Sequence, residues 1–226
     1  MDDSTHKNQP RITVTKNGPY VVSGEVPIAE QIIVIDGVGD SVGWRQGKSY
    51  DPQSKCSLCR CGQSRNKPYC DGSHVKVNFD GTETASKEPY LKRAETIEGP
   101  AITLTDAEDL CSVGRFCDRA GGIWNLVEDS DNPGSRDAAV QEGRDCPSGR
   151  LVVWNEGGTP IEPTFEPSIG LVEDPGMGVH GPLWVRGGIP VVSQDGTTYE
   201  VRNRQTLCRC GRSTNMPFCD GTHGIK

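Results

Sequence analysis

The sequence predicts an α+β fold that is rich in strands, has short helices and contains two related modules with a different segment between them. Three observations support this prediction. The chain has 28 glycines and 16 prolines, which favour turns over long helices. Aromatic residues make up only 6% of the chain, so the apolar cores must be small. Finally, residues 59–74 and 208–223 are identical at eleven of their sixteen positions, without gaps.

The duplication extends upstream of these two segments. The first segment reads CRCGQSRNKPYCDGSH and the second reads CRCGRSTNMPFCDGTH. A fainter similarity joins GPYVVSGEVPI at residues 18–28 to GPLWVRGGIPV at residues 181–191. The first copy has 14 more residues between this lead and the motif. We therefore expect an insertion near residues 35–48.

Local patterns predict the elements of the two modules. Alternating apolar and polar residues predict strands at 11–15 and 31–35. The Asp-Gly pair at 195–196 stands between two strand-like runs and predicts a hairpin turn. Each module is therefore expected to be a β-rich stretch that leads into the repeated motif.

The segment between the modules has a different pattern. Thr105 with Glu108 matches a capping box, which predicts a helix at 106–111. The remaining predictions are a short helix at 135–141, a strand at 151–154 and a long loop at 157–178. We divide the chain into an N-terminal β-rich module (1–94), a middle three-cysteine segment with its linker (95–175) and a C-terminal module (176–226).

Charge and hydropathy narrow the function classes. The net charge is −7 and the sequence pI is about 5.2, so the surface should repel phosphate backbones and we expect no nucleic-acid partner. No run approaches the roughly 20 apolar residues that cross a bilayer, so we expect no membrane partner. The polar start resembles neither a signal peptide nor a transit peptide, and the expected compartment is the cytoplasm.

Each repeated motif supplies three cysteines and one histidine, a donor set suited to a two-iron cluster. Cys-x-Cys places two thiolates close together on a turn, as one iron requires. The third cysteine and the histidine are four residues apart, the spacing of one helical face, so both should reach a second iron. Asp71 and Asp220 are expected to cap the start of that helix.

Two alternatives remain open from spacing alone. Structural zinc also accepts three cysteines and one histidine, although its cysteine pairs are usually separated by two to four residues rather than one. Disulfides would use the thiols but would leave both histidines unexplained.

The full pattern, Cys-x-Cys-x2-Ser-x3-Pro-x-Cys-Asp-Gly-Ser/Thr-His, resembles the signature of CDGSH iron–sulfur domain proteins of the mitoNEET type. Both copies match it in full. The resemblance implies two 2Fe–2S clusters, each held by three cysteines and one histidine, with the histidine-bound iron near solvent. The implied ligands are Cys59, Cys61, Cys70 and His74 in one motif and Cys208, Cys210, Cys219 and His223 in the other.

This sequence departs from the family in the distance between its motifs. Familiar members pair two motifs by dimerising or carry two close together in one chain, whereas here 149 residues separate Cys59 from Cys208. The two sites are expected either to pair across a pseudo-two-fold axis within the chain or to lie apart. Both a monomer and a homodimer are compatible with the sequence.

The middle segment contains three further cysteines, Cys111, Cys117 and Cys146. Cys146 is followed by a proline, as is the last cysteine of the bacterial ferredoxin run. The segment resembles a divergent ferredoxin-like segment found beside CDGSH motifs. Three cysteines suffice for a third cluster of the 3Fe–4S type, or for a 4Fe–4S cluster with an outside ligand; otherwise they pack as small apolar residues.

Conceivable outside ligands are His180, Asp118 and Cys56. Cys56 itself is expected to be a free, exposed thiol, because it stands outside both motifs.

No phosphate-binding loop, Ser-His-Asp set or catalytic carboxylate pair is recognisable, so we expect no enzyme. The leading hypothesis is a one-electron carrier whose partner is a redox protein. The alternative is a donor of clusters to apo-proteins, or a redox or iron sensor. A third hypothesis is a purely structural metal module that holds a glycine-rich fold together.

Overall fold

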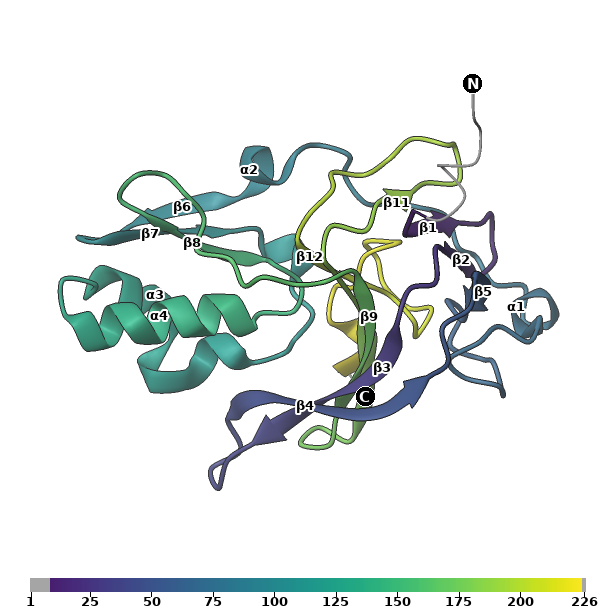
Figure 1. Cartoon of the computed structure of the whole chain (residues 1–226), viewed down its shortest axis with the longest axis horizontal. Coiled ribbons are helices and arrows are strands. Elements are labelled where there is room, and N and C mark those ends of the chain that lie inside the picture. Colours follow the sequence, from purple (N-terminus) through teal and green to yellow (C-terminus); the bar gives the residue numbers. More distant parts are fainter. Residues whose placement is uncertain (1–8, 225–226) are drawn as a thin grey trace.

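The computed structural model of the protein describes residues 9–224 and contains three β-sheets (Figure 1). The first has the order β11-β1-β2-β5, the second β12-β10-β9-β3-β4 and the third β6-β7-β8. The strands are β1 (Arg11–Val14), β2 (Tyr20–Ser23), β3 (Ile28–Ile35), β4 (Ser41–Tyr50), β5 (Lys55–Leu58), β6 (Glu95–Glu98), β7 (Ile102–Asp106), β8 (Leu151–Asn155), β9 (Ser168–Asp174), β10 (Val179–Arg186), β11 (Val191–Val192) and β12 (Arg204–Leu207).

The helices are short. They are α1 (Ser73–Lys76), α2 (Tyr90–Arg93), α3 (Ile123–Glu128) and α4 (Pro133–Asp145), with 3-10 turns η1 (Glu108–Leu110), η2 (Phe116–Gly121) and η3 (Thr222–Gly224). Within residues 9–224, no helix is long and apolar enough to span a bilayer.

The two copies of the repeat exchange strands. In the first copy β1, β2 and β5 are antiparallel neighbours, and in the second copy β9, β10 and β12 are. β11 of the second copy joins β1 in parallel, and β3 of the first copy joins β9 in parallel. The amide of Ile12 donates to the Pro190 carbonyl at 2.9 Å, and the amide of Ile169 donates to the Pro27 carbonyl at 2.9 Å. Each copy therefore completes the other's sheet.

The predicted insertion at 35–48 forms the turn and most of strand β4, which pairs with β3. The Asp36 carboxylate closes this turn by accepting the amides of Val38, Gly39 and Asp40 at 2.9–3.0 Å. The second copy has no corresponding strand, since β11 leads directly into the tight turn at residues 193–197. The β3–β4 hairpin projects from the body of the molecule in Figure 1.

One apolar core lies beneath both copies. Ile12 and Leu58 of the first copy, and Ile169 and Leu207 of the second, are 0% exposed within it. Tyr20 of the first copy is also fully buried, and its hydroxyl lies 2.8 Å from the carbonyl of Cys208 and 3.0 Å from that of Pro217. Because a hydroxyl of one copy reaches the motif of the other, packing in the first copy helps to position the second motif.

The middle segment builds a core of its own. The β6-β7-β8 sheet packs against α3 and α4, and Leu104, Ile123 and Val127 fill the interface. Buried Arg204 of β12 ties this unit to the repeats. Its guanidinium donates to backbone carbonyls of the middle segment, including that of Leu151 at 3.0 Å, and pairs with Glu162 at 2.7 Å.

The structure confirms the predicted strands at 11–15, 31–35 and 151–154, the helix at 135–141 and the turn at 195–196. The helix predicted at 106–111 is wrong. Thr105 belongs to β7, where its hydroxyl lies 2.9 Å from that of Tyr90 and accepts the Trp154 indole N–H at 2.8 Å, and only the single 3-10 turn η1 follows.

The long loop predicted at 157–178 is also wrong, because it contains β9. The sequence of β9, SIGLVED, is bounded by prolines, which are typical of loops and led to the wrong prediction. Four consecutive residues of this strand are buried, as expected of a strand covered on both faces.

Replacement of Ile169 by alanine tests the shared core. Ile169 is 0% exposed and lies in β9 between β3 and β10. We expect the change to lower the free energy of unfolding by about 2–5 kcal/mol, the usual cost of a large buried cavity. Urea denaturation measures it. Val201→Ala, at a position 52% exposed, serves as control and should change stability by less than about 0.5 kcal/mol; equal effects would contradict the shared core.

Candidate metal centres

The N-terminal motif begins where β5 ends. Cys59 donates its amide to the Pro68 carbonyl at 2.8 Å, and Cys70 donates its amide to the Ser57 carbonyl at 2.8 Å. These bonds fold residues 59–70 back onto the strand. The Cys59 and Cys61 sulfur atoms then lie 3.8 Å apart, and the Cys70 sulfur lies 3.3 Å from Nδ1 of His74.

The C-terminal motif repeats this construction. The amide of Cys208 donates to the Pro217 carbonyl and that of Cys219 to the Thr206 carbonyl, each at 2.9 Å. The sulfur atoms of Cys208 and Cys210 lie 3.6 Å apart, and the Cys219 sulfur lies 3.3 Å from Nδ1 of His223. The eight residues singled out in the sequence therefore form four close pairs, two in each motif.

The predicted helical face does not bring cysteine and histidine together. Cys70 precedes α1, and His223 lies in the 3-10 turn η3. A sharp turn joins each pair instead, at Gly72 (φ +83°) and Gly221 (φ +82°), where a left-handed backbone suits glycine. The amide of each glycine donates to the cysteine sulfur, at 3.4 and 3.5 Å.

Asp71 braces the first turn and does not cap the helix, since Gly72 occupies the N-cap position. Its carboxylate accepts the amide of Ser73 at 3.0 Å and that of Arg65 at 2.9 Å. These hydrogen bonds hold the pKa of the Asp71 carboxyl well below its usual value. Asp220 accepts the amides of Thr222 and Thr214 in the same way.

The donors form pairs rather than single-ion cages. Within residues 9–224, no three His, Cys, Asp or Glu side chains converge so that they could hold one metal ion. A zinc site needs four ligands around a single ion. A two-iron cluster instead needs two ligands on each of two irons. Two separate pairs in each motif therefore fit a two-iron group better than a single zinc ion.

The two motifs touch through their backbones. A Cβ added to Gly62 (φ +75°) would lie 2.5 Å from the Cys210 carbonyl oxygen, and one added to Gly211 (φ +77°) would lie 2.6 Å from that of Cys61. Both distances are too short for any side chain. Phe79 and Met216 pack with the cysteines at this contact. The two sites are therefore close neighbours in one chain.

The two sites differ in exposure. His74 is half-buried, whereas His223 is 8% exposed and Cys219 only 2%. Burial raises the pKa of the Cys219 thiol to about 12 and lowers that of His223, because both charged forms lose water. A thiolate at Cys219 therefore requires a cationic partner such as iron. The middle segment supplies the cover, since a Cβ on Gly221 would lie 2.3 Å from the Val113 side chain.

An arginine separates the first two cysteines of each motif, and its surroundings also differ. Arg60 is 1% exposed and donates one hydrogen bond, to the Gly81 carbonyl at 2.7 Å, while its Nε and Nη1 have no partner. Arg209 donates to two carbonyls and pairs with Glu173 at 2.8 Å. Among the described residues, a carboxylate ion pair thus offsets the charge of Arg209 but not that of Arg60. Sequence reasoning missed both arginines and Glu173.

The three middle cysteines line one pocket, together with Gly114 and Pro147. Their spacing contains a signal that the sequence reasoning missed. The bacterial ferredoxin run is Cys-x2-Cys-x2-Cys-x3-Cys-Pro, and Cys111-x5-Cys117 has the spacing of its first and third cysteines. Gly114 occupies the position of the second cysteine. The pocket therefore presents three thiols of a ferredoxin-like set.

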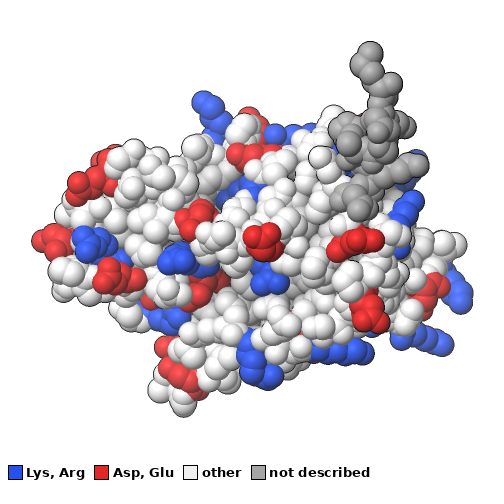
Figure 2. Space-filling model, in the orientation of Figure 1, with Lys and Arg blue, Asp and Glu red and all other residues white. Residues whose placement is uncertain are grey.

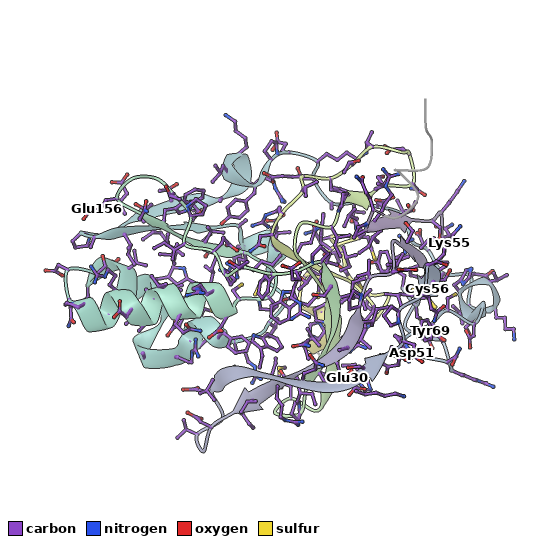
Figure 3. All side chains as sticks on the ribbon, viewed as in Figure 1. Glu30, Asp51, Lys55, Cys56, Tyr69 and Glu156 are labelled. Atoms are coloured by element: carbon purple, nitrogen blue, oxygen red, sulfur yellow. The ribbon has the colours of Figure 1, made fainter. Side chains whose placement is uncertain are left out.

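Of the three suggested outside ligands, Asp118 lies nearest to these cysteines, with a carboxylate oxygen 3.7 Å from the Cys117 sulfur, although it does not line the pocket. His180 lies elsewhere, with Nδ1 2.5 Å from the Glu173 carboxylate. Cys56 belongs to β5 and to the core of the repeats, at the end of the molecule opposite Glu156 (Figure 3). Cys56 is a free thiol, but the prediction that it is exposed is wrong, because it faces inward and is 9% exposed.

Comparison with family models agrees with this geometry. Residues 17–75 and 180–224 both match the family described as iron-binding zinc finger, CDGSH type. Residues 97–156 match the divergent 4Fe–4S mono-cluster family. The chain is a CDGSH iron–sulfur protein. Its middle segment is divergent and ferredoxin-related, and both kinds of domain bind iron or iron–sulfur clusters. A search of curated proteins found no match.

Gly211→Ala tests the contact between the two motifs of this CDGSH protein. The added methyl group meets the Cys61 carbonyl, so we expect unfolding stability to fall by about 2–4 kcal/mol and the iron content to drop. Gly196→Ala is a matched control, because Gly196 has φ +86° and open space around its Cβ position. It should cost only about 1 kcal/mol, from the left-handed backbone. Thermal unfolding and iron analysis measure both variants, and equal losses would contradict the close contact.

Proposed function

We propose that this protein binds two 2Fe–2S clusters, one in each CDGSH motif, and acts as a one-electron carrier. The observation that carries the proposal is the pair of matching donor sets, each with two sulfurs 3.6–3.8 Å apart and a sulfur 3.3 Å from a histidine nitrogen. Cys59, Cys61, Cys70 and His74 would hold one cluster; Cys208, Cys210, Cys219 and His223 would hold the other. Each such cluster would accept and release one electron. The neutral histidine ligand would raise its reduction potential above that of a cluster held by cysteines alone.

The proposal includes a pseudo-two-fold relation between the modules. Two reciprocal features support it: β11 on β1 mirrors β3 on β9, and Gly62 on Cys210 mirrors Gly211 on Cys61. Pairing within one chain keeps the two sites adjacent, which suits passage of an electron between them.

A third cluster at Cys111, Cys117 and Cys146 is part of the same proposal. Their common pocket and the match to a 4Fe–4S family support it. The carbonyl of Cys111 would lie 3.2 Å from a Cβ on Gly221, so the middle site adjoins the C-terminal motif. That motif in turn touches the N-terminal one, which contains half-buried His74, so the C-terminal motif contacts both of the other sites.

Iron and acid-labile sulfide, measured on protein purified without oxygen, test the cluster count. Three clusters would give about seven or eight irons per chain, and a Cys111→Ser/Cys146→Ser variant should retain about four. EPR spectra before and after dithionite should show a signal from the paired motifs only on reduction. Zinc without sulfide would contradict the proposal.

The exposure of His74 favours one alternative, in which the N-terminal site donates its cluster to an apo-protein. Incubation with an apo-ferredoxin distinguishes the two functions. A carrier exchanges electrons within milliseconds to seconds while its iron stays on the chain, whereas a donor loses iron and sulfide to the acceptor.

The carrier function predicts unequal potentials at the two CDGSH sites. Glu173 offsets the charge of Arg209, while no ion pair offsets that of Arg60 among the described residues, so the C-terminal site should have the lower potential. Glu173→Gln should raise one midpoint potential by tens of millivolts, since a partly buried unit charge contributes about 1–2 kcal/mol. A spectroscopic redox titration measures both midpoints.

Exposed Glu156, at the far end of the middle segment, provides the control for this titration (Figure 3). Glu156→Gln makes the same change in net charge and should leave both midpoints in place. A uniform shift in both variants would show that only net charge matters.

A further inference from the structure

The surface around His74 has an apolar centre. His74 lies on the short helix α1 and is half-buried, and its neighbours Val75 and Val77 are 71% and 49% exposed. A hollow of about 440 Å³ opens beside them, with His74, Lys16 and Asp80 on its walls. Single exposed valines are common, but two beside a half-exposed candidate ligand form a contact surface next to the redox site.

The rim of this surface is basic. Lys76 lies between the two valines in the chain, Lys16 lines the hollow with Val75, and Lys67 lines the neighbouring cleft with Val77. Arg65 is held beside the motif turn by the bond from its amide to Asp71. All four cations are exposed and free of ion pairs among the described residues. Asp71 and Asp80 also lie here, and each accepts a backbone amide nearby. Several blue side chains, with red ones among them, lie along the right-hand end of Figure 2, where Figure 1 places α1.

The basic rim continues toward the second site. A cleft of about 760 Å³ shares Asn78, Phe79 and Asp80 with the first hollow, and Lys67 and Arg212 line it. The chain as a whole carries a net charge of −7, so the rest of the protein is negatively charged while this face is positively charged. Charge separation of this kind orients an approaching charged protein.

We propose that this face, defined by Lys16, Arg65, Lys67, Lys76, Val75 and Val77, docks an acidic one-electron carrier protein; the inference rests on the proposed function. An apolar centre with a charged rim has the layout of a protein interface, and a small one suits a transient redox encounter. His74 is the more exposed of the two candidate histidine ligands, so an electron would cross the shortest protein path here. The negative remainder of the chain argues against a nucleic acid or an anionic bilayer, which would have to approach it broadly.

The test uses the full chain with its clusters and a reduced plant-type ferredoxin as the acidic probe. Stopped-flow absorbance gives the second-order rate constant of electron transfer at several salt concentrations. Lys67→Glu/Lys76→Glu should lower this constant about ten-fold or more at low salt, because electrostatic steering is lost. The difference from the unaltered chain should disappear near 1 M salt, where charges are screened beyond about 3 Å.

Lys92→Glu/Lys55→Glu is the matched control, with the same change in net charge at two exposed lysines outside the face. It should alter the rate constant less than two-fold. Midpoint potentials of each variant separate a change in driving force from a change in docking. Equal losses in both double variants, or a loss that persists at high salt, would overturn the docking face.

Two further measurements keep the inference separate from the proposed function. Failure of the unaltered chain to take up electrons reversibly from dithionite would refute the carrier function itself. Reversible reduction, combined with equal rates in the unaltered and Lys67→Glu/Lys76→Glu chains, would refute the docking face alone. Selective loss of binding to phosphatidylserine vesicles, without a change in the ferredoxin rate, would overturn the proposal in favour of a lipid surface.

Discussion

The exchange of one parallel strand in each direction between the two copies is the constraint on which the rest of this structure depends. β11 on β1 and β3 on β9 join the two copies, and the motifs begin where β5 and β12 end. The contact between the two Cys-Arg-Cys-Gly loops follows from this arrangement, and it tolerates nothing larger than glycine at residues 62 and 211. The donors of each motif are then fixed by backbone hydrogen bonds from the returning chain rather than by side-chain packing alone.

The surroundings of the two motifs have diverged while their backbones have not. Lys16 lines the hollow beside His74, whereas Glu173 pairs with Arg209 of the second motif, so residues of opposite charge lie beside the two sites. The middle segment packs against the second motif at Val113, and His223 there is 8% exposed, whereas His74 of the first motif is half-buried. Burial and charge therefore act in the same direction: the more buried site has its arginine paired with Glu173, whereas the other lies beside a buried guanidinium that forms no ion pair within residues 9–224.

Residue spacing was sufficient to predict the duplication and the β-rich modules, and it singled out the eight residues that form the four close pairs, because ligand chemistry fixes local spacing tightly. The prediction failed where local and tertiary signals disagree. Thr105 and Glu108 match a capping box, yet Thr105 satisfies its hydroxyl in a sheet. β9 is flanked by prolines and resembles a loop, and only its burial between β3 and β10 makes it a strand. The roles of Arg60 and Glu173 depend on partners 21 and 36 residues away, which no local pattern contains.

Carrying both halves in one polypeptide frees each half to vary. In a symmetric homodimer every substitution appears twice, so lysine at one site would mean lysine at both. Here the strands that a second subunit would lend come from the same chain, and dilution cannot separate them. One gene product can thus keep the shared framework while it specialises its two ends, with Lys16 at one and Glu173 at the other. The duplication lets the two motif-bearing ends of the molecule present different surfaces, which a symmetric pair of identical subunits cannot do.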